Sequence, residues 1–412
     1  MIRRVRVKNF GCLKDVDVEL GPLTLLLGPN ASGKSTFIRA VQAVSKLLRS
    51  ALRGEHGEFR LERATLDELA GDNQQPILFS VWLNEDTNPT YSLQIQKVAG
   101  LWTVTREALN FEGFAFDSST GPFEFRTQRR GVIRLGTGNE DLRHASIPYL
   151  VYPYREDGVA CPSIRPFLDF AASFGLAYRY RVNPSDLVTP TLPPWIRRDE
   201  PYTDQSGNGF VATLQSWFQR VDGRRTFDDV VLPELHTLFP HIRGIGFKRG
   251  VGGGIALEYE TDRKREAVPA ELESDGVNMG LFLLCIPYLL ANVPADSVCL
   301  GLEEPEAGTH PFLQEQRLHY LRHFAGRTIG GRRYQIIATT HSVELVRWVR
   351  QEEFLDIARF VEHLGPEEGT KIHRLLDQKD VDRVYEAYER NPGIAWYSGL
   401  FGGVPARPVS MI

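Results

Sequence analysis

Apolar and polar residues alternate over the first 20 positions of the chain, and the alternation then gives way to a continuous apolar run. The alternation in residues 2–8 (IRRVRVK) and 15–20 (DVDVEL) predicts two strands that each bury one face. The run in residues 22–28 (PLTLLLG) is typical of a parallel strand buried on both faces. Residues 35–48 then place apolar side chains at helical spacing. The pattern therefore predicts a strand, a short loop and a helix in succession.

Short strand-like pieces recur between residue 76 and about residue 136. Turn residues such as Asn88–Pro89 and Gly121–Pro122 separate them. We expect these pieces to form an antiparallel β subdomain that is inserted after the helix. The pieces are ILFSVWL, YSLQIQKV, LWTVTRE, FEGFAF and GVIRL.

The second half of the chain has a less uniform pattern. Residues 147–155 (IPYLVYPYR) predict another core strand, whereas residues 160–250 mix aromatic, proline and glycine residues with helical stretches such as FVATLQSWFQRV. Strand-like residues 255–260 follow, after which strands and helices alternate again. No heptad pattern is sustained, and this excludes a long coiled coil.

Composition excludes several classes of protein. The 412 residues are 42% hydrophobic and 24% charged, as in ordinary globular domains, and a formal net charge of −4 gives no overall basic signature for nucleic acid. The four cysteines form no C-x-x-C pair, which argues against a zinc site and suits a reducing cytoplasm. The longest apolar run, residues 279–291, is too short for a membrane span and contains Pro287. We expect a cytoplasmic protein without a membrane partner, in which this run forms a buried, kinked helix.

The loop between the apolar strand and the first helix carries the clearest chemical signal. Gly28, Gly33, Lys34 and Ser35 match the pattern G-x-x-x-x-G-K-[ST] without a mismatch. Glycines let successive backbone N–H groups point at phosphate oxygens, and Lys34 brings a positive charge to the β and γ phosphates. The Ser35 hydroxyl can take one position around Mg²⁺. The predicted nucleotide-binding residues are Gly28, Pro29, Asn30, Ala31, Ser32, Gly33, Lys34, Ser35 and Thr36.

Polar side chains also follow two later strands. The apolar run 298–302 ends in Glu303 and Glu304, and residues 334–340 lead into His341. Acids at the carboxyl end of a buried strand lie where α/β sheets place catalytic groups. Phosphoryl chemistry needs one acid near Mg²⁺ and one that orients the attacking water, and a histidine can donate a hydrogen bond to the γ-phosphate or to that water. The alternatives are a solvated acidic turn and an ordinary histidine without a catalytic role.

Together these motifs resemble the ABC-type ATPase heads of chromosome-maintenance and RecF-like proteins. More narrowly, they resemble the AAA-like bacterial ATPases of the overcoming-lysogenisation-defect and Septu type. The opening of the chain has that family's order of elements, including the NF before the second strand. LEEPEAGTHP (302–311) is similar to the family's Walker B and D-loop, THS (340–342) to its switch histidine motif, and ESDGVNMGLFLL (273–284) to its signature motif. The resemblance covers residues 1–50 and 265–350.

The resemblance implies a role for each acid and for the histidine. Glu304 would be the catalytic base, and His341 would be the switch histidine. Glu303, with Ser35, would serve the metal, although an aspartate is common at the position of Glu303 and its longer side chain would shift the metal-bound water.

The signature motif implies a second chain. In the family, its serine and glycine face the γ-phosphate that the other subunit binds, and this assigns that role to Ser274, Asp275 and Gly276. The SDG sequence departs from the transporter form SGGQ. For the family's Q-loop glutamine, the candidates are Gln74 and Gln75.

The expected fold is α/β: a P-loop NTPase head of the ABC type with an antiparallel β subdomain and an inserted mixed lobe. Residues 1–155 would form the N-terminal part of the head with the phosphate loop, residues 156–250 the inserted lobe, and residues 251–412 the C-terminal part of the head. About 240 residues separate Lys34 from Ser274, which leaves room for a lobe but not for long coiled-coil arms. A transporter subunit would be more compact and would need a membrane partner.

The leading functional hypothesis is an ATP-hydrolysing switch, a homodimer or larger oligomer, in bacterial anti-phage defence or DNA repair. It would couple ATP and Mg²⁺ binding to DNA or to a partner effector. The alternative is a nucleotide-gated scaffold that holds a partner nuclease or toxin and hydrolyses ATP slowly. A fused nuclease domain is disfavoured, because only about 70 residues follow His341 and we expect no separate acidic cluster such as a D-x-D metal site among them. The basic cluster 126–130 (RTQRR) would contact nucleic-acid phosphate or lie in solvent.

Overall fold

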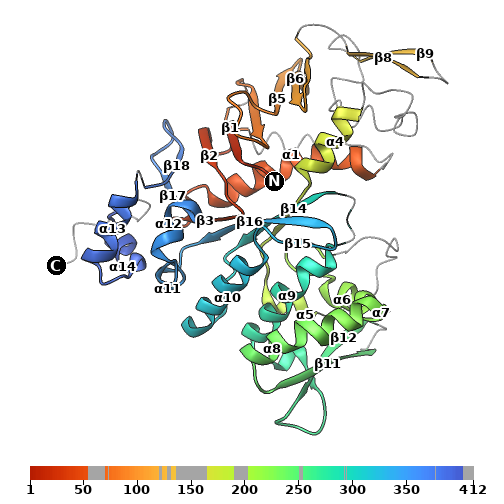
Figure 1. The fold of residues 1–412 in the computed structure, drawn as a ribbon, viewed down its shortest axis with the longest axis vertical. Helices are drawn as coiled ribbons and strands as arrows, with labels where there is room; N and C mark the ends of the chain where they lie inside the picture. Colours follow the sequence, from red (N-terminus) through yellow and green to blue (C-terminus); the bar gives the residue numbers. More distant parts are fainter. Residues whose placement is uncertain are drawn as a thin grey trace.

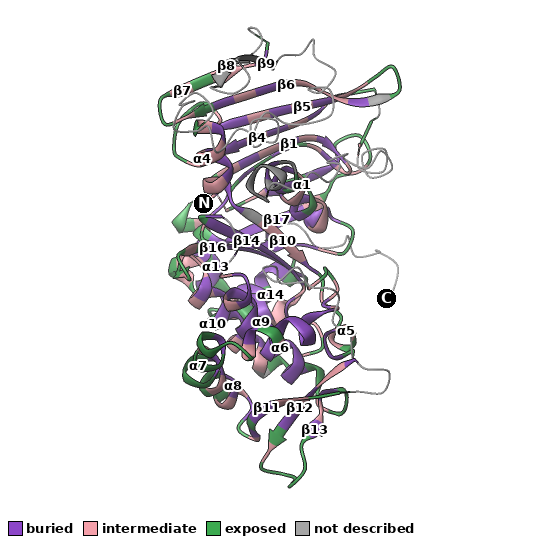
Figure 2. Ribbon diagram, turned by 90° about the vertical axis from the view of Figure 1, so that its right-hand side faces the viewer, coloured by how far each residue is buried: buried purple, intermediate pink, exposed green. Residues whose placement is uncertain are grey.

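Three regions follow one another along the long axis of the molecule (Figures 1 and 2). An antiparallel sheet lies at one end, a mainly parallel sheet in the middle, and helices with a three-stranded sheet at the other end. This arrangement confirms the predicted α/β class. The computed structural model describes residues 1–53, 70–72, 74–119, 123–127, 131–135, 165–189, 203–249, 254–291, 293, 295–375 and 377–401.

The antiparallel sheet has six strands in the order β2-β1-β4-β5-β6-β7. Alternate side chains on its strands are buried, as the sequence pattern predicts; Val5 and Val7 are at most 1% exposed. They share one apolar cluster with side chains of α1 (Lys34–Arg53) and α4 (Arg165–Phe174). The strands are β1 (Arg4–Phe10), β2 (Leu13–Glu19), β4 (Ile77–Trp82), β5 (Tyr91–Val98), β6 (Leu101–Phe111) and β7 (Phe114–Asp117).

The predicted β subdomain is therefore one sheet with the two N-terminal strands, since β1 pairs with both β2 and β4. The piece FEGFAF holds a turn, because Glu112 and Gly113 have φ angles of 49° and 81° and connect β6 to β7. β8 (Phe123–Thr127) and β9 (Gly131–Leu135) pair with each other. The predicted strand 147–155 and residues 128–130 of the basic cluster lie outside the described residues.

The central sheet has the order β10-β14-β16-β3-β17-β18, and its first five strands are parallel. Every residue of β3 and β14 is buried, which confirms the interpretation of the continuous apolar runs as buried parallel strands. The strands are β3 (Leu23–Leu27), β10 (Leu176–Tyr180), β14 (Ser297–Glu303), β16 (Arg332–Thr340), β17 (Ala358–His363) and β18 (Thr370–His373), with the short β15 (Thr328–Ile329) beside β16.

The far region combines short helices with the sheet β11-β12-β13. Its longest helix, α9 (Asp275–Leu289), is apolar on all sides and almost wholly buried, as predicted for the apolar run, with Pro287 in its last turn. The other elements are α5 (Pro184–Val188), α6 (Phe210–Phe218), α7 (Val221–Thr226), the π-helical turn η4 (Phe227–Val231), α8 (Leu232–Leu238), β11 (Ile242–Arg249), β12 (Ile255–Thr261), β13 (Val268–Pro269) and the 3₁₀ turn η5 (Ala270–Leu272).

The observed regions differ from the expected domain boundaries at two places. β10 falls within residues 156–250, yet it is a strand of the central sheet and pairs with β14. The hairpin of β11 and β12 spans the expected boundary at residues 250 and 251. The lobe that projects from the head therefore runs from α5 to α9, and α4 and β10 belong to the head.

The remaining helices lie beside the central sheet and, farther along the chain, near the C-terminus (Figure 1). They are α10 (Pro311–Phe324), α11 (Val343–Arg347), the 3₁₀ turn η6 (Gln351–Glu353), α12 (Phe354–Ile357), α13 (Gln378–Ala387) and α14 (Pro392–Tyr397). Within the described ranges, no helix has both the length and the apolarity needed to cross a bilayer.

Candidate active site

The predicted site residues meet at the carboxyl edge of the parallel sheet. The phosphate loop follows β3, Glu303 ends β14, and His341 follows β16. The register places Glu303 opposite Thr339 and Thr340 opposite Leu27, so these three strands end side by side. Ligands of open α/β sheets bind at this edge, and the geometry therefore brings the two halves of the predicted site together.

Lys34 lies at the centre of the phosphate loop. Its Nζ donates to the carbonyl oxygens of Gly28 and Pro29, both at 2.7 Å, and its side chain is buried. Burial lowers the pKa of Lys34, an effect that the nearby carboxylates of Glu304, Glu306 and Glu303 oppose. The lysine is thus a cation held by two carbonyl dipoles at the start of α1, where the helix dipole also attracts anions.

The β17–β18 hairpin packs directly on the phosphate loop. A Cβ on Gly28 would lie 2.2 Å from the carbonyl oxygen of Val361, and a Cβ on Gly33 would lie 2.3 Å from Thr370 Oγ1. Gly33 also has a φ of 106°, which side chains rarely adopt. The Thr370 hydroxyl donates to the carbonyl oxygen of Ser32 at 2.8 Å. Close packing therefore requires glycine at both positions, and the positive φ is a second requirement at Gly33.

Glu303 forms the link between the phosphate loop and the neighbouring strand. The Ser35 hydroxyl donates to its Oε2 at 2.7 Å, and Arg179 on β10 forms an ion pair with its Oε1. Arg179 also donates to Gln205 at 2.8 Å. Sequence analysis missed Arg179, although the alternation in LAYRY (176–180) could have indicated the strand that carries it.

The residues at this point suit Mg²⁺. Ser35 and Glu303 were assigned to the metal independently, and their oxygens converge within hydrogen-bond distance. Among the described residues, no group of three or more histidine, cysteine or acidic side chains could hold a metal alone. Mg²⁺ is commonly bound by one or two protein oxygens together with phosphate oxygens and water, and Ser35 and Glu303 could supply the two protein oxygens.

Glu304 and His341 form the exposed part of the site. Glu304 has a φ of 49°, and its backbone N–H donates to the Thr339 carbonyl at 3.0 Å. This turn at the strand end lets Glu304 leave the sheet, and its Oε1 lies 3.5 Å from Nδ1 of His341. Their side chains are 31% and 48% exposed, so both can reach a bound molecule.

Glu306 is a buried acid that the sequence analysis did not place in the site. It is 6% exposed, its Oε1 accepts a hydrogen bond from the Thr340 hydroxyl, and its Oε2 has no partner among the described residues. Burial raises the pKa of Glu306 above its usual range.

We expect Glu306→Gln to stabilise the chain more at high pH than at low pH. A raised carboxyl pKa means that the folded state still holds a proton at pH values where the unfolded state has released it. The free energy of unfolding therefore falls as the pH rises above the pKa that this carboxyl has in the unfolded chain. Glutamine keeps an oxygen for Thr340 and removes this cost. The difference in Tm between the variant and the wild type, measured from pH 4 to pH 8, should grow with pH. A difference that is constant over this range would contradict the buried, raised acid.

The signature residues lie apart from the phosphate loop of their own chain. Ser274 is the N-cap of α9, and its side chain accepts a hydrogen bond from the backbone N–H of Val277. The Asp275 side chain lies beside Gly308, within 3.6 Å of the position that a Cβ on Gly308 would take. In the described part of the chain, no hydrogen bond or ion pair joins residues 274–276 to residues 28–36.

The Q-loop candidates lie before β4. Gln74 and Gln75 are exposed, and the Asn9 side chain donates to the Gln75 carbonyl at 2.8 Å. Asn9, the first residue of the NF pair, has a φ of 54° and also donates to the Asp72 carbonyl at 2.8 Å. The Asn9 side chain therefore holds the backbone of Asp72 and of Gln75 beside β1.

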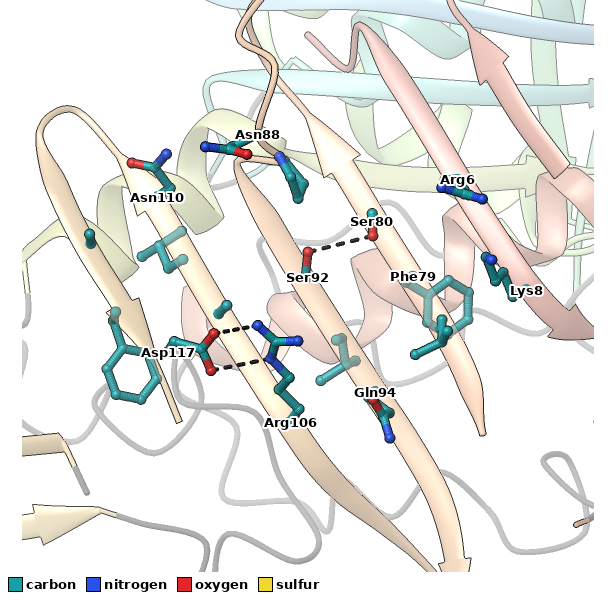
Figure 3. A pocket seen from close by; sticks show the side chains of 17 residues that line it. Arg6, Lys8, Phe79, Ser80, Asn88, Ser92, Gln94, Arg106, Asn110 and Asp117 are labelled. Carbon is teal, nitrogen blue, oxygen red and sulfur yellow. Dashed lines mark hydrogen bonds and ion pairs between the residues drawn. The ribbon is translucent and has the colours of Figure 1, made fainter. Parts of the chain in front are cut away.

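Two other polar features lie outside the site. A D-x-D pattern that the sequence analysis overlooked, Asp380 and Asp382, lies on α13. A groove of about 760 Å³ crosses the outer face of the antiparallel sheet (Figure 3), lined in part by Arg6 and Arg106. Arg106 forms an ion pair with Asp117 (Figure 3), and Arg6 forms one with Asp15. Neighbouring acids therefore neutralise both arginines.

Comparison with known proteins agrees with this geometry. The family described as "AAA ATPase domain" matches residues 1–90. An OLD nuclease from Thermus scotoductus is 54% identical over 44 residues, a segment that spans 11% of this chain and 8% of that protein's length.

Comparison with solved structures found several SMC head domains. One is an SMC head bound to the C-terminal winged-helix domain of ScpA (12% identity, TM-score 0.47, covering 92% of this chain and 98% of that one). Another is the SMC head domain from Thermotoga maritima (12% identity, TM-score 0.39, covering 91% and 99%). A third, from Pyrococcus furiosus, is an SMC head with an extended coiled coil bound to the C-terminal domain of ScpA (11% identity, TM-score 0.47, covering 94% and 99%).

Proposed function

We propose that this chain acts as an ATP-driven dimeric switch. It would do so as a P-loop ATPase of the ABC type that is related through its N-terminal segment to the OLD proteins. Two heads would close over two ATP molecules, and hydrolysis would reopen them. One observation carries the proposal. Lys34, Glu303, Glu304 and His341 meet at one sheet edge, with the last two side chains open to solvent where a second head would close.

Each residue has a defined task in this proposal. Lys34 would transfer its hydrogen bonds from the two loop carbonyls to the β and γ phosphates. Glu304 would accept the proton of the attacking water, and His341 would hold Glu304 or the γ-phosphate in position. Mg²⁺, bound near Ser35 and Glu303, would neutralise charge that develops on the phosphates.

The biological setting that we propose is bacterial anti-phage defence or DNA repair, in the cytoplasm. The nucleotide state would be coupled to DNA or to an effector protein, and the name of the OLD relative makes a nuclease the first effector to test. The second candidate is a scaffold that sequesters a nuclease or toxin and turns ATP over slowly. DNA that accelerates ATP turnover would favour the switch, and a bound effector that ATP releases without rapid turnover would favour the scaffold.

The dimer is tested by Ser274→Arg. An arginine in place of the small cap of α9 should block closure and turnover, while the single chain still binds ATP, because its own phosphate loop is untouched. ATP-dependent dimerisation can be followed by light scattering, and ATP affinity by isothermal titration. Full turnover by this variant would remove the signature assignment.

Mixing Ser274→Arg with Lys34→Ala tests whether each site is shared by two chains. In a mixed dimer, one composite site would carry both changes and the other neither. An equal mixture should therefore regain up to about one quarter of wild-type turnover, the value reached if the intact site works at its full rate, since half of the dimers would have one intact site of two. A mixture that stays inactive although mixed dimers form would contradict independent sites shared between chains.

A further inference from the structure

The helix that follows the acid motif, α10, sends two buried polar side chains towards the site. Gln314 is 8% exposed and Arg317 is 4% exposed. They are three residues apart and therefore share one face of the helix. No motif in the sequence analysis included either residue.

Arg317 joins two motifs that are far apart in the sequence. Its Nη1 donates to the carbonyl oxygen of Pro305, the residue directly after Glu304, and its Nη2 donates to the carbonyl oxygen of Gly276 at 3.4 Å. Within the described ranges it forms no ion pair, and burial lowers its pKa to about 9. The charge of Glu306, a buried acid of the same motif, opposes this shift, so two carbonyl oxygens and a nearby carboxyl group offset part of the cost of burying the guanidinium.

Gln314 connects the same helix to the histidine motif. The hydroxyl of Ser342, which follows His341, donates to Gln314 Oε1 at 2.7 Å. The backbone N–H of Ser342 donates to Thr340 Oγ1 at 2.9 Å, and Thr340 in turn donates to the buried Glu306. One face of α10 thus contacts the residues next to the catalytic base, next to the histidine and within the signature motif.

We propose that α10 couples the two ATP sites of the dimer, with Arg317 as the positioning residue. This rests on the proposed dimeric switch. There, Glu304 acts on the ATP of its own chain, whereas Gly276 faces the ATP of the partner. A displacement of Pro305 on ATP binding or hydrolysis changes the hydrogen bonds of Arg317 and is passed to Gly276. Each site then senses the nucleotide state of the other.

The planar guanidinium is suited to this task because it presents separate N–H groups to two carbonyls in fixed directions. Lysine keeps the charge but carries all its donors on one nitrogen, whereas the two carbonyls of Arg317 are bound by two separate nitrogens, Nη1 and Nη2. The Arg317→Lys variant therefore keeps the positive charge and removes the connection between the two carbonyls. Arg347→Lys provides the matched control, because Arg347 on α11 is half-exposed and its ion-pair partner is Glu344.

The first test measures ATP turnover against ATP concentration for both variants. Wild type and Arg347→Lys should be cooperative, whereas the Hill coefficient of Arg317→Lys should fall to about 1 without a loss of ATP affinity in the single chain. An unchanged Hill coefficient with lower Tm and kcat would assign Arg317 a merely structural role and overturn the inference. A wild-type chain that dimerises on ATP without cooperativity would overturn the inference alone. A wild-type chain that does not dimerise would overturn the proposed function as well.

A second experiment examines the coupling with Arg317 intact, and it can be done even if Arg317→Lys does not fold. Ser274→Arg chains should stay monomeric, so their signature helix cannot contact any ATP. Hydrogen exchange of residues 276–284 should nevertheless change when such a monomer binds ATP, because Arg317 connects Pro305 to Gly276. Exchange that is unaffected by ATP in this monomer would overturn the coupling through α10.

Discussion

Glu304→Gln should stop ATP turnover and leave ATP binding intact. Glutamine preserves the shape of the side chain but cannot accept a proton from the attacking water, so we expect kcat to fall roughly 10²- to 10⁴-fold. Because Lys34 and its loop are unchanged, the variant should hold ATP and remain in the closed dimer. Light scattering with ATP and Mg²⁺ would detect that dimer, and a phosphate-release assay would measure the turnover.

Glu344→Gln is a matched control for this experiment. Glu344 lies on α11, near His341 in the sequence, but its partner is Arg347 on the helix surface. We expect this variant to hydrolyse ATP at the wild-type rate. If Glu304→Gln did so too, the base would have to be sought at Glu303 or at the buried Glu306.

Lys34→Ala should remove most of the ATP affinity of the chain. The substitution deletes the charge that would meet the β and γ phosphates, and hydrogen bonds to charged groups contribute about 1.5–3 kcal/mol each. We therefore expect Kd for ATP to rise roughly 10- to 100-fold in isothermal titration. Lys46→Ala, an exposed position on the same helix, should bind ATP like the wild type. Unchanged affinity in Lys34→Ala would mean that the loop is not the phosphate site.

Local pattern was enough to predict the first two strands and the two buried strands β3 and β14. The alternation in residues 2–8 and 15–20 became β1 and β2, because one face of each strand packs on α1 and α4. The apolar runs became β3 and β14, because the two faces of the parallel sheet pack into two separate apolar clusters. The turn at Glu112 and Gly113 was missed because the apolar residues around it continue the strand pattern.

The residues that the sequence could not reveal act through tertiary contacts. Arg179 reaches Glu303 because β10 pairs with β14, a pairing across more than 100 positions of sequence. Arg317 contacts Gly276 because α10 packs near the start of α9. Nothing in the residue types around these arginines distinguishes them from surface arginines, and only the fold assigns them partners.

The position of β3 also constrains how the protein can be made. Its two neighbours in the central sheet, β16 and β17, are synthesised about 300 residues after it. At a translation rate of roughly 5–20 residues per second, the strand that precedes the phosphate loop emerges at least about 15 seconds before it can pair. During this interval a strand with four leucines in five residues is exposed on the ribosome, where it is a target for chaperones and a risk for aggregation. Residues 1–90 expressed alone would lack those partner strands permanently, so we expect that fragment to be insoluble.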